Sequence, residues 1–251
     1  MARAVVRRAV VSKSVSPTLR YESVSVGDDH FEAFCAVPES GSGPGILLFQ
    51  EIFGINDNIR HVAEQLAEAG YTVLAPDMFW RIERRFERKD ESGMADAFAM
   101  VQQFDLSHAA TDIAACHAHL LAMSECTGQI GAIGFCLGGA LAFSAATLSR
   151  VDGRGIDAAV CYYGSAINGM IDQASNLHCP SVFHYGADDP FISADDIASV
   201  EVAVSGRPGV EFYRYDAGHA FSNWDAPSMY NQAAADVAWA RTLDFFARHL
   251  D

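Results

Sequence analysis

The sequence predicts an α/β fold, with one mostly parallel central sheet and helices on both faces. Apolar runs alternate with amphipathic helical patterns from residue 45 onward, and this alternation favours right-handed crossovers between parallel strands. The 251 residues fit a single domain, without repeats or a low-complexity linker. Polar residues follow several predicted strands, at the sheet edge where α/β proteins bind ligands.

The predicted elements follow one another in a regular order. Residues 21–26 and 31–37 form a hairpin around the turn Gly27-Asp28-Asp29. Further strands are predicted at residues 45–50, 71–75, 129–134, 157–162, 181–185 and 210–215. Helices are predicted at residues 56–69, 95–104, 109–123, 137–148, 194–204 and 228–250. Gly70 ends the first helix as its C-terminal cap.

Charge and composition narrow the class of protein. The net charge of −15 argues against a nucleic-acid partner, since phosphate binding needs clustered lysine and arginine. No apolar stretch is long enough for a membrane helix or a secretory signal. The basic residues 1–20 predict a flexible tail, with an organelle-targeting segment as the alternative, before a domain at residues 21–251. We expect a monomer or small homo-oligomer in the cytoplasm, with no membrane partner.

Five of the six cysteines are predicted to be reduced, buried side chains. They form no CxxC pair and no zinc-like spacing, so we expect neither a metal nor another cofactor. Cys136 is the exception, because it stands in Gly134-Phe135-Cys136-Leu137-Gly138-Gly139 between a predicted strand and a predicted helix. This is the G-x-nucleophile-x-G elbow, with cysteine where serine usually stands. No G-x-S-x-G occurs in the sequence to compete for the role.

The elbow spacing has a physical cause. The chain turns sharply from strand to helix, which strains the nucleophile's backbone and leaves room only for glycine at the flanking positions. The helix N-terminus directs its dipole and free N–H groups toward the thiol, which favours a thiolate and later an oxyanion.

A base and an acid are expected later in the chain, in the order nucleophile, acid, histidine. Of the nine histidines, only His219 follows a glycine in a loop directly after a strand. The acid lies in Ala187-Asp188-Asp189-Pro190, after the strand at residues 181–185. Asp188 is favoured because it comes first, while the proline biases Asp189 toward an extended shape. Asp189 is then expected to cap the turn.

These residues resemble the dienelactone hydrolase (carboxymethylenebutenolidase) family of α/β-hydrolases. The matching stretches are Gln50-Glu51-Ile52-Phe53-Gly54, Ala75-Pro76-Asp77, Gly134–Gly139, Tyr162-Tyr163-Gly164, Gly186–Asp188 and Gly218–Phe221. Together they extend from about Tyr21 to the C-terminus. The resemblance implies an α/β-hydrolase fold and a catalytic set of Cys136, Asp188, His219 and Glu51. In the family, the glutamate at the Glu51 position takes part in converting the thiol to the thiolate.

The family pattern also implies how the substrate is held. Backbone N–H groups of Ile52 and Leu137 are the expected oxyanion donors. Arg81 stands where the family has one of two arginines that hold the substrate carboxylate, and Asn223 stands where it has the other. Phe53 and Trp80, together with Phe79, Phe135 and Phe221, are candidates for an apolar pocket.

The leading hypothesis is a cysteine-dependent hydrolase that opens a dienelactone-like lactone or a small activated carboxylic ester through an acyl-thioester. The first alternative is an esterase or lactonase of broader specificity, which Asn223 favours. The second is a non-catalytic thiol redox or binding protein on the same scaffold.

Overall fold

Eight strands form one sheet in the order β1-β2-β4-β3-β5-β6-β7-β8 within residues 16–89 and 91–250, which the computed structural model describes. The strands are β1 (Thr18–Val26), β2 (Asp29–Val37), β3 (Gly43–Phe49), β4 (Thr72–Pro76), β5 (Cys126–Phe135), β6 (Ala158–Tyr162), β7 (Ser181–Gly186) and β8 (Val210–Tyr215). β1 pairs with β2, and β2 with β4, in antiparallel register, and the other pairs are parallel. The prediction of a mostly parallel sheet is confirmed.

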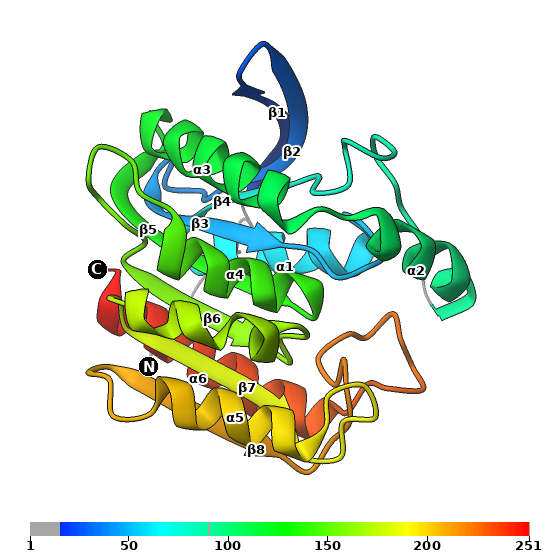
Figure 1. Cartoon of the computed structure of the whole chain (residues 1–251). Helices are drawn as coiled ribbons and strands as arrows, with labels where there is room; N and C mark the ends of the chain where they lie inside the picture. Colours follow the sequence, from blue (N-terminus) through cyan, green and yellow to red (C-terminus); the bar gives the residue numbers. More distant parts are fainter. Residues whose placement is uncertain (1–15, 90, 251) are drawn as a thin grey trace, which may run out of the picture.

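Helices cover both faces of this sheet. Figure 1 shows α3 (Leu106–Ala122), α4 (Leu137–Leu148) and α5 (Ala194–Val204) in front of it, and α1 (Asp57–Glu68) and α6 (Gln232–His249) behind it. α2 (Met94–Gln103) lies beyond the ends of the strands. The 3₁₀ segments η1 (Glu91–Gly93) and η2 (Ile167–Asn176) complete the elements. No helix in the described ranges is both long and apolar enough to span a membrane.

The core lies between the sheet and its helices. Ile46, Leu47 and Leu48 of β3 have no exposed surface, because this central strand is covered on both faces. α4 contacts the sheet with small side chains, and its N-terminal half packs against β5 and β6 so closely that glycine is required. A Cβ on Gly138 would lie 2.2 Å from the Phe49 carbonyl oxygen. The helix start that follows Cys136 is therefore fixed by backbone contact.

The predicted boundaries agree with the structure to within a few residues, with two instructive differences. β1 begins at Thr18, inside the range predicted to be a tail, and Arg20 bridges Glu22 and Glu125. Residues 1–15 of that predicted tail lie outside the described residues. α6 begins at Gln232 and not at residue 228, since Asn231 accepts a hydrogen bond from the Ala234 amide as the N-cap. The two 3₁₀ segments were not predicted.

Candidate active site

The nucleophile elbow has the expected strained geometry. Cys136 lies between β5 and α4 with φ 55° and ψ −115°, a conformation unusual for any residue other than glycine. Its amide donates to the Tyr162 carbonyl at 3.1 Å. Glycine is needed beside it, because a Cβ on Gly134 would lie 1.9 Å from the Gly138 carbonyl oxygen. The turn thus presents the Cys136 side chain to the cavity at the carboxyl end of β5.

His219 is paired with Asp189, and the prediction of Asp188 is corrected. The Nδ1 atom of His219 lies 2.7 Å from Asp189 Oδ2, and the Asp189 side chain has no exposed surface. Asp188 is exposed, and its backbone amide donates to the Ala217 carbonyl. The other oxygen of Asp189 accepts the amides of Phe191 and Ile192, so this residue also caps the turn as expected.

The electrostatics of His219 favour an imidazolium. Burial lowers the pKa of His219, but the charge of a Cys136 thiolate and the hydrogen bonds to Asp189 and Cys136 outweigh it and raise the pKa to about 10. Because Nδ1 faces Asp189, Nε2 is the ring nitrogen left to exchange a proton with Cys136. A thiolate–imidazolium pair held by a buried carboxylate is the arrangement that activates a cysteine nucleophile.

Glu51 lies in a buried polar cluster beside this pair. Its carboxylate accepts a hydrogen bond from the Tyr163 hydroxyl at 3.2 Å and another from the Asn223 amide. Burial raises the pKa of Glu51 to about 7, against the opposing effects of His219 and of the two hydrogen bonds. The Tyr163 ring also lies 5.0 Å from the His219 ring, centre to centre. Glu51 is therefore poised to gain or lose a proton near neutral pH.

A cavity of about 180 Å³ opens above these residues. Glu51, Cys136 and His219 line it, as do Ile52, Phe53 and Leu137. The Leu137 amide is the first of α4 and has no acceptor within the helix, which leaves it free for an oxyanion. Ser165 was not predicted, although its hydroxyl oxygen lies 3.6 Å from the Cys136 sulfur. No sequence motif marks Ser165, which lies in the turn between β6 and η2.

Two of the predicted substrate contacts, Trp80 and Arg81, lie outside this cavity. The Arg81 guanidinium makes a two-point contact with Asp112 of α3, at 2.6 and 3.0 Å. The Trp80 indole donates to the same carboxylate at 2.9 Å and stacks on Phe31 at 5.2 Å. The structure does not bring these two side chains to the cavity, because both contact Asp112 of α3. Phe53 does line the cavity, whereas Phe79, Phe135 and Phe221 belong to the core.

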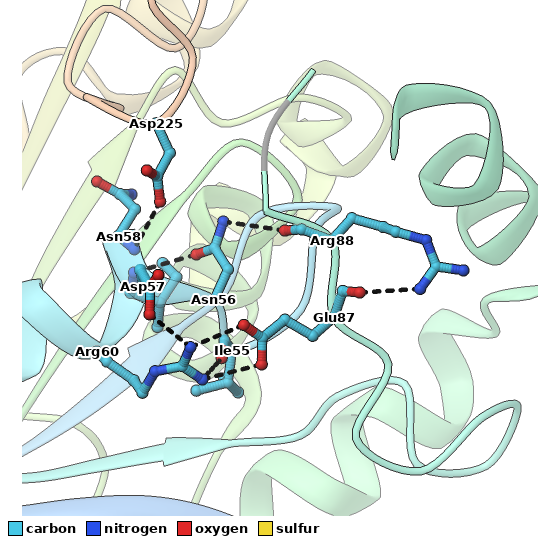
Figure 2. A network of polar contacts seen from close by, with 9 residues as sticks. Ile55, Asn56, Asp57, Asn58, Arg60, Glu87, Arg88 and Asp225 are labelled. Carbon is cyan, nitrogen blue, oxygen red and sulfur yellow. Dashed lines mark hydrogen bonds and ion pairs between the residues drawn. The ribbon is translucent and has the colours of Figure 1, made fainter. Parts of the chain in front are cut away.

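Asn223 was also predicted to contact substrate, and the structure gives it a different partner. Its side chain is 1 % exposed and donates to Glu51. The loop that carries Asn223 is fixed to α1, since the Asp225 carboxylate accepts the Asn58 amide at 3.1 Å. Figure 2 shows this contact beside the network in which Arg60 joins Asp57 and Glu87. The loops that carry Asp225 and Glu87 are thus both held to the N-terminal end of α1.

A single mostly parallel sheet, a strained nucleophile elbow, and an acid and histidine later in the chain define an α/β-hydrolase. The chain belongs to the dienelactone hydrolase family, whose model matches residues 31–250. It is accordingly a hydrolase that acts on esters or lactones.

Known relatives cover almost the whole chain. A carboxymethylenebutenolidase from a Pseudomonas species is 33 % identical over 88 % of this chain and 92 % of its own length. One from Pseudomonas putida is 31 % identical over 90 % of this chain and 94 % of its own. Among solved structures, a dienelactone hydrolase-like promiscuous phosphotriesterase from metagenomic libraries is 25 % identical. It has a TM-score of 0.77 and covers 94 % of this chain and 100 % of its own.

Proposed function

We propose that this protein opens a dienelactone-like lactone or a small activated carboxylic ester through an acyl-thioester on Cys136. The observation that carries the proposal is the Asp189–His219 pair, which faces the same cavity as the strained Cys136. The proposed triad is Cys136, His219 and Asp189, with Glu51 as an additional proton acceptor. The Ile52 and Leu137 amides are the proposed oxyanion donors.

The reaction begins with acylation. The Cys136 sulfur attacks the carbonyl carbon, and the carbonyl π electrons move to the oxygen, which the amides of Ile52 and Leu137 stabilise. The tetrahedral intermediate collapses by breaking the bond to the ring or ester oxygen. That oxygen takes the proton from Nε2 of His219, which leaves a hydroxyl group and a thioester on Cys136.

Deacylation uses the same groups in the reverse direction. Neutral His219 removes a proton from water, and the resulting hydroxide attacks the thioester carbon. The carbon–sulfur bond then breaks, which releases the carboxylic acid and restores the thiolate–imidazolium pair. Asp189 keeps Nδ1 of His219 protonated throughout, so that Nε2 alone exchanges protons.

Replacement of the nucleophile tests the mechanism. Cys136→Ala should abolish hydrolysis of lactones and aryl esters, lowering kcat by about 10³-fold or more, because no acyl-enzyme can form. The wild type is mixed with an ester that it hydrolyses slowly, the reaction is quenched rapidly with acid, and the intact protein mass is measured. The wild type should carry a covalent acyl adduct that the variant lacks. Cys179→Ala, which removes a buried thiol that does not line the cavity, is the control.

Three results would redirect the assignment. Full activity of Cys136→Ala would exclude this residue as the nucleophile. Hydrolysis of aryl esters without any lactone would favour the esterase of broader specificity. An absence of turnover on every ester, with reversible oxidation of Cys136, would favour the thiol redox or binding protein.

A further inference from the structure

The cavity wall is apolar apart from Ser165 and three groups of the proposed reaction. α2 contributes Met94, Phe98 and Val101, and two loops contribute Phe191 and Met229. The polar side chains are Glu51, Cys136, Ser165 and His219. Within residues 16–89 and 91–250, neither a lysine nor an arginine lines the cavity. This wall can bury hydrocarbon but has no free cation for a carboxylate.

The arginines in the loop after β4, where the substrate-binding Arg81 was expected, are already paired with carboxylates elsewhere. Each of the four in the loop after β4 contacts an acidic side chain on another part of the fold, in the pairs Arg81–Asp112, Arg84–Asp29, Arg85–Glu32 and Arg88–Asp96. None of these four arginines lines the cavity. A substrate carboxylate would have to break one of these pairs and draw the side chain into the site.

His219 and Asn223, two polar residues near Glu51, supply no free positive charge. The positive charge of a protonated His219 is already paired with the buried Asp189 carboxylate. Asn223 is neutral and donates its amide to Glu51. When Glu51 ionises, near its pKa of about 7, it adds a negative charge to the cavity wall. A substrate carboxylate would meet like charge there and lose its hydration without compensation.

The rim of the cavity exposes aromatic surface to water. Phe98 is 44 % exposed and Phe191 is 57 % exposed. The Phe191 ring lies 5.2 Å from the His219 ring, so it stands directly beside the reacting groups. An apolar acyl chain between these two phenylalanines would cover both, and burial of such surface is favourable.

We infer that the substrate of this site is an uncharged lactone or ester with an apolar acyl group, and that Phe98 and Phe191 select it. The inference rests on the proposed hydrolytic function and narrows its substrate class to esters and lactones without a carboxylate, which excludes a lactone that carries one. A carboxylate on the acyl chain should be rejected, because the wall offers it no partner. Phe98 and Phe191 act on substrate selection and take no part in the bond-making steps.

A matched pair of esters tests this inference. 4-Nitrophenyl pentanoate and mono(4-nitrophenyl) glutarate have acyl chains of equal carbon number, and the second ends in a carboxylate. The wild type should cleave the glutarate with kcat/KM lower by about 100-fold or more, as expected for burying an unpaired charge. Equal rates on the two esters would overturn the inference and leave the hydrolytic function intact. Cleavage of neither ester, or of any lactone, would overturn both.

A charge added to the wall provides the second arm of the test. Phe98→Arg puts a cation on an exposed position of α2, and it should raise the glutarate-to-pentanoate ratio of kcat/KM by about 10-fold. Phe98→Leu keeps the wall apolar and should leave that ratio near the wild-type value. An unchanged ratio in Phe98→Arg would show that Phe98 does not face the acyl chain, and would overturn its assignment.

Discussion

Two adjacent carboxylates differ entirely in what they touch. Asp189 is buried against His219 and also accepts two backbone amides, whereas Asp188 is exposed to solvent. The difference arises because the chain turns immediately after β7, so that successive side chains point in different directions. One position along such a turn decides whether a carboxylate orients a histidine or faces water.

Replacing each carboxylate by its amide separates these roles. Asp189→Asn should lower kcat/KM by about 10²- to 10⁴-fold. The imidazolium loses its buried negative partner, and nothing then keeps the proton of the neutral imidazole on Nδ1. The asparagine oxygen can still accept the amides of Phe191 and Ile192, so the turn should persist. Asp188→Asn is the matched control and should stay within about twofold of the wild type. Ester hydrolysis measures the loss of activity in each variant, and circular dichroism checks that each remains folded. A larger loss of kcat/KM in Asp188→Asn than in Asp189→Asn would assign the orientation of His219 to Asp188.

The positions and contacts of the site residues were predicted unevenly from the sequence, for a physical reason. Cys136 and His219 follow from local patterns, since the elbow and the strand-end loop determine where they lie. The partner of Arg81 is Asp112, and the partner of Asn223 is Glu51, each far away in the chain. No local pattern specifies such pairs, because they depend on how whole elements pack. The sequence favoured Asp188 over Asp189 as the partner of His219, and this was wrong for a related reason. Tertiary contacts set the direction of the turn, and so decide which of the two side chains faces His219.

At the scale of elements, the strand–turn–helix unit β5-Cys136-α4 is a tightly packed part of the site. The Cβ positions of Gly134 and Gly138 are occupied by backbone atoms of neighbouring segments. The boundaries of α4 were predicted to the residue, because the elbow defines its start. The short segment η2 was missed, since a 3₁₀ stretch lacks the longer apolar periodicity that marks an α-helix.

The crowding at Gly138 gives a stability prediction. Gly138→Ala should lower the free energy of unfolding by about 2–4 kcal/mol, because the new methyl group would lie 2.2 Å from one carbonyl oxygen and 2.5 Å from another. Gly169→Ala, at a position with open space, should change it by less than about 1 kcal/mol. Urea denaturation followed by tryptophan fluorescence measures both. Similar losses in the two variants would show that close packing at the elbow is not the cause.

At the scale of the whole molecule, the mostly parallel sheet and the placement of helices on both faces were predicted, whereas the order of the strands in the sheet was not. Alternating strand and helix patterns constrain an α/β chain to few arrangements, so the parallel part of the sheet followed directly. The N-terminal hairpin was also predicted, although its first strand begins earlier than expected. The burial of a titratable group such as Glu51 became visible only in the assembled fold.

The buried Glu51 links global stability to pH. The pKa of Glu51 is about 7 in the folded protein, whereas the ordinary value for glutamate is 4.5. The folded state therefore binds this proton more tightly than the unfolded state does. The resulting stabilisation is complete below pH 4.5 and is lost as the pH rises to 7. Glu51→Gln puts an uncharged side chain at this buried position, so the variant does not lose stability as the pH rises. At pH 8 the substitution should increase the free energy of unfolding by up to about 3 kcal/mol.

Urea denaturation at pH 5 and pH 8 checks this expectation. The gain from Glu51→Gln should be larger at pH 8 than at pH 5. Glu68→Gln, an exposed change at the end of α1, is the control and should show no such difference between the two pH values. An equal effect of Glu51→Gln at both values would contradict the linkage.

The left-handed backbone of Cys136 has a consequence for how this sequence can evolve. A residue with a side chain in that conformation costs about 1–3 kcal/mol, and glycine would relieve much of that cost. With Cys136 as the proposed nucleophile, selection for stability and selection for activity therefore favour different residues at this position. Where selection for hydrolysis is relaxed, we expect the thiol to be lost by drift, with the fold retained and the activity lost.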